Sequence, residues 1–171
     1  MGYRTKTYIA GDWDSSKQEI EKLKEWNEKK HLALEFLDAH EKTQARDGSL
    51  NCSIKKSLKT RLDITKKFIL IVGNSTNNTR SGSCQYCDNY SKYIQACLKG
   101  YSTNFKSYID YECSYASTEQ LDIIVLYCSV NIQKNLCPDS IKSIGIHIPM
   151  YYYSNGKKYW NYEKIKKAIC N

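Results

Sequence analysis

Residues 68–72 read Phe-Ile-Leu-Ile-Val, an apolar run in which no polar residue alternates with the apolar ones. A strand with one face in water shows that alternation, whereas an unbroken apolar run is typical of a strand covered on both faces. Such strands occupy the centre of parallel sheets that carry helices on each side. The run ends at Gly73-Asn74, so we expect the central strand of an α/β fold to end there.

Strand-like and helix-like stretches alternate on either side of this run. The other expected strands are 5–10, 32–37, 123–127 and 144–148, and the expected helices are 16–26, 50–62, 105–116 and 161–169. Strands that alternate with helices favour a parallel sheet with right-handed crossovers. We therefore predict a three-layer sandwich of the flavodoxin type, with a central parallel five-stranded sheet in the order 2-1-3-4-5. The period of two in 144–148, followed by Pro149, indicates an edge strand.

Two helices carry clear local signals. Leu50, Ile54, Leu58 and Leu62 recur at every fourth position, which predicts one apolar stripe facing the sheet. Ser16 and Glu19 have the spacing of a capping box, so we expect the first helix to start at Ser16.

Two segments fall outside the alternation. Residues 79–104 follow the third expected strand and form an inserted flap that carries Cys84, Cys87 and Cys97. Residues 151–171 are expected to form an aromatic hairpin and a last helix, because Asn155-Gly156 is a strong signal for a tight hairpin turn.

The chain has 171 residues, of which 41% are hydrophobic, and this fits a single domain over 1–171. No run of about 18 apolar residues and no signal-peptide pattern is present, so we expect a cytoplasmic protein without a membrane segment. The net charge of +8 favours anionic partners. The basic residues are scattered over expected helix faces, so a nucleic-acid partner is not expected.

Eight cysteines in a cytoplasmic chain are expected to be reduced thiols. Cys84-x-x-Cys87 and Cys97 offer three ligands, whereas a structural zinc site takes four. Cys113 or a histidine could be the fourth, and reduced thiols or a labile disulfide remain alternatives. Because no second pair is present, no metal site is assigned. Cys52, Cys128 and Cys170 are interpreted as small core residues.

Acidic residues gather where a ligand would bind in this fold, beyond the carboxyl ends of the strands. Glu112 lies on the flank of an apolar stripe formed by Ile109, Cys113 and Ala116. A carboxylate in a partly dry cleft can orient ribose hydroxyls and stabilise the cation that forms when an N-glycosidic bond breaks. The alternatives are that Glu112 is a solvated helix residue and that Asp12 and Asp38 serve turns. A Mg²⁺ site of the receiver type is disfavoured because no Asp ends the third strand.

Five stretches together resemble the TIR-like family of bacteria and archaea, which includes the B-type sensor proteins of the Thoeris antiphage system. They are Tyr8-Ile-Ala-Gly-Asp-Trp-Asp14, Leu34-Glu-Phe-Leu-Asp-Ala-His40, Ser53-Ile-Lys-Lys-Ser-Leu58, Phe68-Ile-Leu-Ile-Val-Gly73 and Tyr108-Ile-Asp-Tyr-Glu-Cys-Ser-Tyr-Ala116. Their order and spacing carry the likeness, which covers residues 5–128. The resemblance implies a flavodoxin-like sandwich and, as in many members, cleavage of NAD⁺ to nicotinamide with formation of a cyclic or conjugated ADP-ribose signal. The long cysteine-bearing insert departs from the family pattern.

The resemblance also implies roles for individual residues. Glu112 matches the catalytic glutamate of the family, and the loops after strands one and two match loops that line the nucleotide site. We expect Trp13 to stack on a ring and Asp12 or Asp38 to bind hydroxyls. The complete set of expected substrate-binding residues is Gly11, Asp12, Trp13, Asp14, Asp38, His40, Asn74 and Tyr108.

The first hypothesis is thus an NAD⁺-consuming enzyme of antiphage defence that has NAD⁺ as substrate and needs no cofactor. Its partners would be NAD⁺ or a related nucleotide, an effector protein reached through a diffusible signal, and further copies of the chain. The second hypothesis is an adaptor or nucleotide sensor that binds without chemistry.

Overall fold

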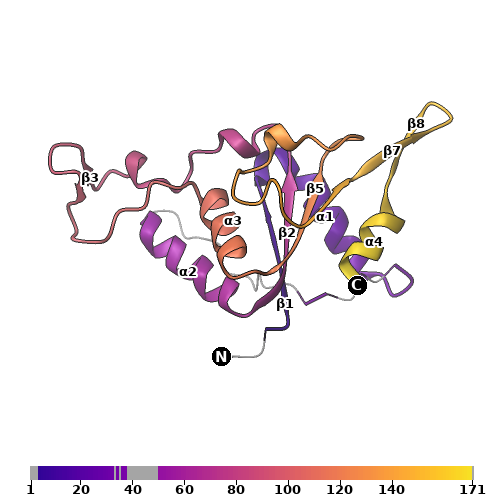
Figure 1. Ribbon diagram of the computed structural model, residues 1–171, viewed down its shortest axis with the longest axis horizontal. Coiled ribbons are helices and arrows are strands. Elements are labelled where there is room, and N and C mark those ends of the chain that lie inside the picture. The colour runs from indigo at the N-terminus through magenta and orange to yellow at the C-terminus, as the bar shows by residue number, and fades with distance from the viewer. Residues whose placement is uncertain (1–3, 33, 35, 38–49, 171) are drawn as a thin grey trace.

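The computed structural model describes residues 4–32, 34, 36–37 and 50–170. Its centre is a parallel sheet of four strands in the order β1-β2-β5-β6 (Figure 1). The strands are β1 (Lys6–Gly11), β2 (Thr65–Val72), β5 (Asp122–Tyr127) and β6 (Ile146–Pro149). They correspond to the first, third, fourth and fifth strands expected from the sequence, and β6 forms the expected edge.

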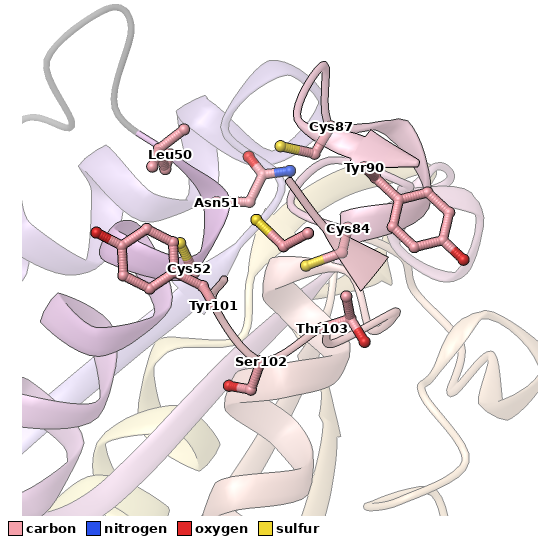
Figure 2. Close-up of a pocket in the computed structure, with 10 residues that line it drawn as sticks. Leu50, Asn51, Cys52, Cys84, Cys87, Tyr90, Tyr101, Ser102 and Thr103 are labelled. Atoms are coloured by element: carbon pink, nitrogen blue, oxygen red, sulfur yellow. The ribbon is translucent and has the colours of Figure 1, made fainter. Parts of the chain in front are cut away.

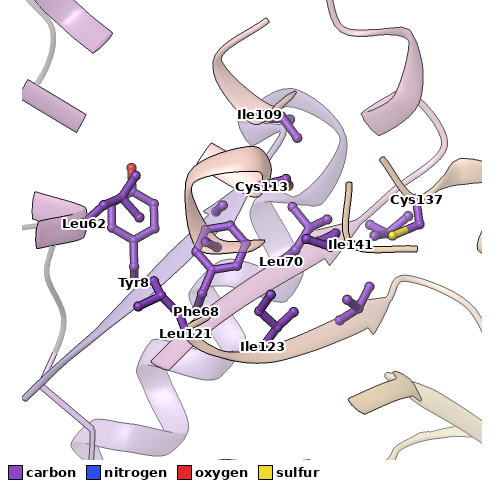
Figure 3. Packing of buried hydrophobic residues seen from close by; sticks show 14 of the residues in the cluster. Tyr8, Leu62, Phe68, Leu70, Ile109, Cys113, Leu121, Ile123, Cys137 and Ile141 are labelled. Atoms are coloured by element: carbon purple, nitrogen blue, oxygen red, sulfur yellow. The ribbon is translucent and has the colours of Figure 1, made fainter. Parts of the chain in front are cut away.

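Helices cover both faces of the sheet, which gives the three layers expected. α1 (Trp13–Glu28) and α4 (Tyr162–Cys170) lie on one face, and α2 (Asn51–Asp63) and α3 (Tyr108–Thr118) lie on the other. Strand β2 divides its side chains between the two faces. Phe68, Leu70 and Val72 pack toward α2 and α3 (Figure 3), and Ile69 and Ile71 pack toward α1 and α4. None of the five is more than 1% exposed, so the central strand is confirmed.

The second expected strand, 32–37, is not among the strands of the described sheet, which has four strands rather than five. Residues 33 and 35 lie outside the described part of the chain. Leu37 nevertheless accepts a hydrogen bond from the Thr7 backbone N–H at 2.8 Å, which brings this segment to the free edge of β1. The Phe36 backbone bonds the Asn27 side-chain amide through both its N–H (3.1 Å) and its carbonyl (3.0 Å). Because a side chain takes these bonds, they build no further ladder, and the complete order 2-1-3-4-5 stays a prediction.

The insert after β2 has little regular structure and extends from the body of the molecule as an arm (Figure 1). The short 3₁₀ helix η1 (Thr76–Asn78) precedes residues 79–104 of the insert, which contain the 3₁₀ helix η2 (Cys84–Tyr86) and a hairpin of β3 (Tyr90–Ser91) and β4 (Ala96–Cys97). A further 3₁₀ turn, η3 (Lys134–Leu136), follows β5.

The C-terminal hairpin is confirmed. β7 (Tyr151–Ser154) pairs with β8 (Lys157–Trp160), and the turn residues Asn155 and Gly156 have φ of 49° and 74°. Positive φ at both central positions is what a two-residue hairpin turn of the Asn-Gly type requires.

The start of α1 differs from the sequence prediction. The helix begins at Trp13, three residues before the expected cap, and Ser16 is a fully buried, non-helical residue within it (φ −131°, ψ 16°). Glu19 does not complete a capping box, because its carboxylate accepts a hydrogen bond from the Tyr151 hydroxyl at 2.7 Å. A tertiary contact thus takes the side chain that the local pattern assigned to a cap. None of the helices described is both long and apolar enough to cross a membrane.

Candidate functional site

Helix α3 holds Glu112 between its apolar stripe and the edge of the sheet. The helix starts at a reciprocal cap, in which the Ser107 hydroxyl accepts from the Asp110 backbone N–H (3.1 Å) and donates to the Asp110 carboxylate (2.7 Å). This cap fixes where the helix begins and therefore which residues face the sheet. The expected stripe of Ile109, Cys113 and Ala116 is buried, with exposures between 0% and 4%.

Glu112 is 7% exposed, and its carboxylate accepts a hydrogen bond from the Tyr8 hydroxyl on β1. Tyr8 itself is fully buried, and its ring stacks on Phe68 at 5.8 Å between centroids. The interpretation of Glu112 as a solvated helix residue is therefore wrong. Burial strengthens the field of a carboxylate by removing water, and the Tyr8 hydroxyl fixes the direction in which the carboxylate points.

The loops that follow β1 and β2 meet at the carboxyl edge of the sheet. Gly73, directly after β2, is packed against the start of α1, because an added Cβ would lie 2.8–2.9 Å from the hydroxyl oxygens of Ser15 and Ser16. The Asp12 side chain, which precedes α1, accepts from the Ser15 hydroxyl at 2.7 Å. Gly11 and Asn74 are therefore carried to the same edge, as the topology of the sheet predicts.

Most of the other residues that the sequence predicted to bind substrate are either exposed or not fully described by the structure. Trp13 is 52% exposed, and the Lys17 ammonium lies 5.9 Å from its ring centroid. Asp14 lies in the first turn of α1, and its side chain is outside the described structure. Asn74 is exposed. Asp38 and His40 also lie outside the described residues.

Tyr108 occupies the first turn of α3 but faces the base of the arm. Its hydroxyl donates to the Asn51 side-chain carbonyl at 2.9 Å, and its ring lies directly against Gly82. Burial raises the pKa of the Tyr108 hydroxyl, with the thiols of Cys87, Cys52 and Cys84 adding to the effect. Tyr108 and Glu112 belong to the α2/α3 side, whereas Asp12 and Trp13 lead into α1 on the opposite face. The two sets can meet only across the carboxyl edge of the sheet.

The arm contributes polar side chains that the sequence did not single out. One open hollow of about 380 Å³ at the start of α3 is lined by residues that include Arg80, Gln85, Tyr86, Ser107 and Asp110. A wider one of about 700 Å³ adjoins it along Lys106, Asp110 and Ser114. Glu112 lines neither hollow. The Arg80 guanidinium lies 5.8 Å from the Tyr86 ring, so the arm folds back on itself here.

Comparison with protein families gives a match over the first part of the chain. Residues 8–81 match the family described as Thoeris protein ThsB, TIR-like domain. The match confirms the resemblance over this range, which contains β1 from Tyr8 on, α1, α2, β2 and η1. The TIR-like match supports a TIR-like role in antiphage defence. A search of curated proteins found no match.

The TIR-like match ends before α3. Glu112 and Tyr108 therefore lie outside it, and the assignment of Glu112 depends on the motif resemblance and on the contact with Tyr8. The loop after β1, which includes Gly11, and the loop after β2, which includes Asn74, both lie within the match.

Proposed function

We propose that this chain is an NAD⁺-consuming enzyme of bacterial antiphage defence, in which Glu112 is the catalytic carboxylate. The observation that best supports this role is the burial of Glu112 against β1, where Tyr8 donates a hydrogen bond to it. A buried and oriented carboxylate is what the chemistry of N-glycosidic cleavage needs.

In the proposed reaction the bond between C1′ of the ribose and the nicotinamide nitrogen breaks. The bonding pair leaves with nicotinamide, which becomes neutral, and positive charge develops on C1′ and the ring oxygen of the ribose. The negative charge of Glu112 stabilises this oxocarbenium-like state more strongly in a poorly hydrated site than in water. Water, or a nucleophilic atom of the same ADP-ribose, then attacks C1′ and loses a proton, which gives ADP-ribose or a cyclic product.

The loops at the carboxyl edge would bind the rest of the nucleotide. Trp13 presents an exposed ring, and stacking of a base on an aromatic side chain contributes about 1–3 kcal/mol. Gly11 and Asn74 border the same edge, and Asp12 accepts a hydrogen bond there from the Ser15 hydroxyl. Asp14, Asp38, His40 and Tyr108 complete the proposed binding set. NAD⁺ is the substrate and no cofactor is required. The product would act on a separate effector protein as a diffusible signal, and the chain would act in the cytoplasm, alone or as a homo-oligomer.

The direct test measures nicotinamide release from NAD⁺ by chromatography and mass spectrometry. Because an antiphage enzyme can require a trigger, the assay uses purified protein and also extracts of expressing cells before and after phage infection. We expect Glu112→Gln to lower release by about 100-fold or more, since removal of a single electrostatic stabiliser has effects of that size. Glu21→Gln is the matched control, because Glu21 has a side chain 58% exposed on α1.

Two results would contradict the proposal. Equal release by the wild type and Glu112→Gln would remove Glu112 from the reaction. Saturable NAD⁺ binding by calorimetry, with no nicotinamide released in either extract, would identify the chain as a non-catalytic adaptor or nucleotide sensor.

A further inference from the structure

The arm after β2 contains a long stretch in which no side chain is buried. From Gln85 to Lys106 every residue is at least partly exposed, and Tyr93, Ile94 and Leu98 are 101%, 64% and 66% exposed. Fixing the backbone of one residue costs about 1–2 kcal/mol in conformational entropy, and burial of apolar surface normally offsets this cost. Small folds without a sufficient core commonly depend on disulfides, on a metal ion or on association with further chains.

Four cysteines line one small cavity at the base of this arm (Figure 2). Cys52 comes from the first turn of α2, Cys84 and Cys87 come from η2 and the residue after it, and Cys97 ends β4. The cavity has a volume of about 10 Å³, which is room for one water-sized sphere. All four are free thiols. Three segments of the chain thus bring four cysteine side chains to one small cavity.

Backbone hydrogen bonds hold two of these cysteines, Cys84 and Cys87, in a turn and direct one N–H group at a sulfur atom. The Cys87 N–H donates to the Cys84 carbonyl at 3.1 Å, which closes the Cys-x-x-Cys turn. The Asn104 N–H donates to Cys84 Sγ at 3.2 Å. A backbone N–H directed at sulfur favours the charged thiolate, and outer hydrogen bonds of this kind orient the ligands of metal sites.

A buried cation lies beside the cavity. Lys55, one helical turn after Cys52, is 4% exposed, and its ammonium donates to the Asn104 carbonyl (3.0 Å), the Asn104 side chain (3.1 Å) and the Lys106 carbonyl (2.6 Å). These acceptors are neutral, and within the described part of the chain Lys55 has no ion-pair partner within 4.0 Å. A buried charge is normally compensated by an opposite one. Four thiolates outweigh the charge of one divalent ion, so a metal held by them would be a net anion next to Lys55.

We propose that Cys52, Cys84, Cys87 and Cys97 bind one Zn²⁺ ion that fastens the arm to α2. In their present positions, no three or more His, Cys, Asp or Glu side chains of the described residues could hold a metal ion. Binding therefore includes rotation of the four side chains until each sulfur lies about 2.3 Å from the metal, with release of the thiol protons. Cys113, which the sequence offered as a fourth ligand, lies instead on α3 and is fully buried in the core between this helix and the sheet.

The test measures the zinc content of the full chain, purified in a reducing buffer, by elemental analysis. The same protein is then stripped with a chelator and titrated with Zn²⁺. We expect one Zn²⁺ per chain in the wild type and loss of stoichiometric zinc in Cys52→Ser and in Cys84→Ser. Cys170→Ser is the control, because Cys170 is an exposed cysteine at the end of α4 on the other face of the sheet, and this variant should keep one Zn²⁺.

Trypsin gives a second readout that does not depend on enzymatic activity. Lys92 and Lys99 lie on the exposed arm, so zinc should protect the peptide bonds after them and removal of zinc should expose these bonds. A wild-type chain that takes up no zinc, or zinc uptake that Cys52→Ser leaves unchanged, would overturn the proposal. Disulfides among the four cysteines in the reduced preparation, detected as the loss of hydrogens by mass spectrometry, would also overturn it.

Discussion

The Tyr8 hydroxyl on β1 donates a hydrogen bond to the Glu112 carboxylate on α3, although the two residues are 104 positions apart in the chain. The bond joins the edge strand of the described sheet to the crossover helix that covers it. The backbone of β1 is fixed by its ladder with β2, and the helix is fixed by its buried stripe. The carboxylate is thus positioned by two rigid elements, as a catalytic group requires.

Tyr8→Phe keeps the buried ring against Phe68 and removes the hydroxyl that donates to Glu112. We expect a loss of about 1–3 kcal/mol in the free energy of unfolding, because a buried acceptor loses a donor. If Glu112 is catalytic, nicotinamide release should fall about tenfold or more in Tyr8→Phe and should not fall further when Tyr8→Phe is added to Glu112→Gln. Urea unfolding and the nicotinamide assay measure the two effects. Tyr159→Phe, on the exposed hairpin, should change neither quantity.

Gly82→Ala should disturb the junction between the arm and α3. Gly82 has φ of +92°, and a Cβ at this position would lie 2.4–2.5 Å from the Tyr108 ring. The ring would have to move, and its hydroxyl would leave Asn51. Gly100→Ala is the matched control, since Gly100 has φ of +74° with nothing within 4 Å of an added Cβ.

Both substitutions carry the cost of a positive φ, of the order of 1 kcal/mol. Only Gly82→Ala adds a steric clash, so we expect it to be more destabilising by about 1–3 kcal/mol in urea unfolding. Equal destabilisation by the two variants would mean that the Tyr108 ring can make room for a methyl group at position 82 without a cost in stability.

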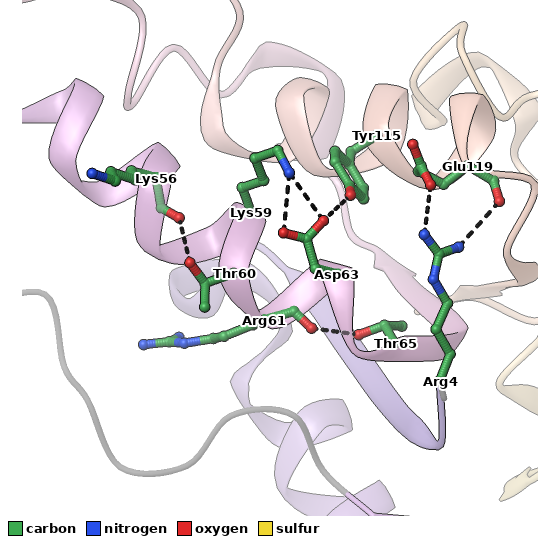
Figure 4. A network of polar contacts seen from close by, with 9 residues as sticks. All are labelled: Arg4, Lys56, Lys59, Thr60, Arg61, Asp63, Thr65, Tyr115 and Glu119. Atoms are coloured by element: carbon green, nitrogen blue, oxygen red, sulfur yellow. Dashed lines mark hydrogen bonds and ion pairs between the residues drawn. The ribbon is translucent and has the colours of Figure 1, made fainter. Parts of the chain in front are cut away.

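Asp63 at the end of α2 joins that helix to α3 through Tyr115, and it also pairs with Lys59 at 3.0 Å (Figure 4). The hydrogen bond from Tyr115, and then the one from Lys59, lowers the pKa of Asp63 below its usual value of 3.8. The contribution of Asp63 to stability is therefore complete above pH 3.8 and decreases as the pH falls toward the lower pKa of the folded state. The Asp63 side chain is 44% exposed, so we expect Asp63→Asn to cost less than about 1 kcal/mol at pH 7.

The difference between the wild type and Asp63→Asn should become smaller as the pH falls below 3.8. Urea unfolding at pH 7 and pH 3 measures this difference. Asp139→Asn, at a carboxylate whose side chain is 94% exposed, should show no such pH dependence. A difference of the same size at pH 3 and pH 7 would show that the Asn variant disturbs packing rather than charge.

Much of the fold follows from patterns within single segments. Residues 68–72 predicted a strand covered on both faces, and the structure buries them from Phe68 to Val72. The Asn155-Gly156 turn was predicted because few residue pairs accept positive φ at both positions. These signals are local, so no knowledge of distant contacts is needed to read them.

The parts that could not be predicted depend on contacts between distant segments. Glu19 had the spacing of a cap, but Tyr151 takes its carboxylate. Cys52 was interpreted as a core residue, whereas the structure places it in one cavity with the cysteines of the arm. No local pattern could show this, because only the fold brings the start of α2 to the arm. The Tyr8 hydroxyl as partner of Glu112 had no signal at all, since a tyrosine in an apolar strand is expected to pack.

The contact between Tyr151 and Glu19 leads to a prediction for alkaline pH. The Tyr151 hydroxyl donates to the Glu19 carboxylate at 2.7 Å, and both side chains are less than 10% exposed. Burial first, and the hydrogen bond to Glu19 second, raises the pKa of Tyr151 above its usual value of 10.0. The folded chain therefore keeps the phenol proton where the unfolded chain loses it. The stability that Tyr151 contributes is complete below pH 10 and decreases as the pH rises above it.

Tyr151→Phe should be less stable than the wild type at pH 7 by about 1–3 kcal/mol, because Glu19 loses its donor. Above pH 10 the wild type should lose stability faster than this variant, by up to about 1.4 kcal/mol per pH unit for the one additional proton. Tyr115 and Tyr127 also have raised pKa values, but they are present in both proteins and cancel in the comparison. Urea unfolding from pH 7 to pH 11 gives the two slopes, with Tyr153→Phe as control on the same strand, where the side chain is 64% exposed. Parallel slopes for the wild type and Tyr151→Phe would show that Tyr151 loses its proton equally readily in the folded and unfolded chains.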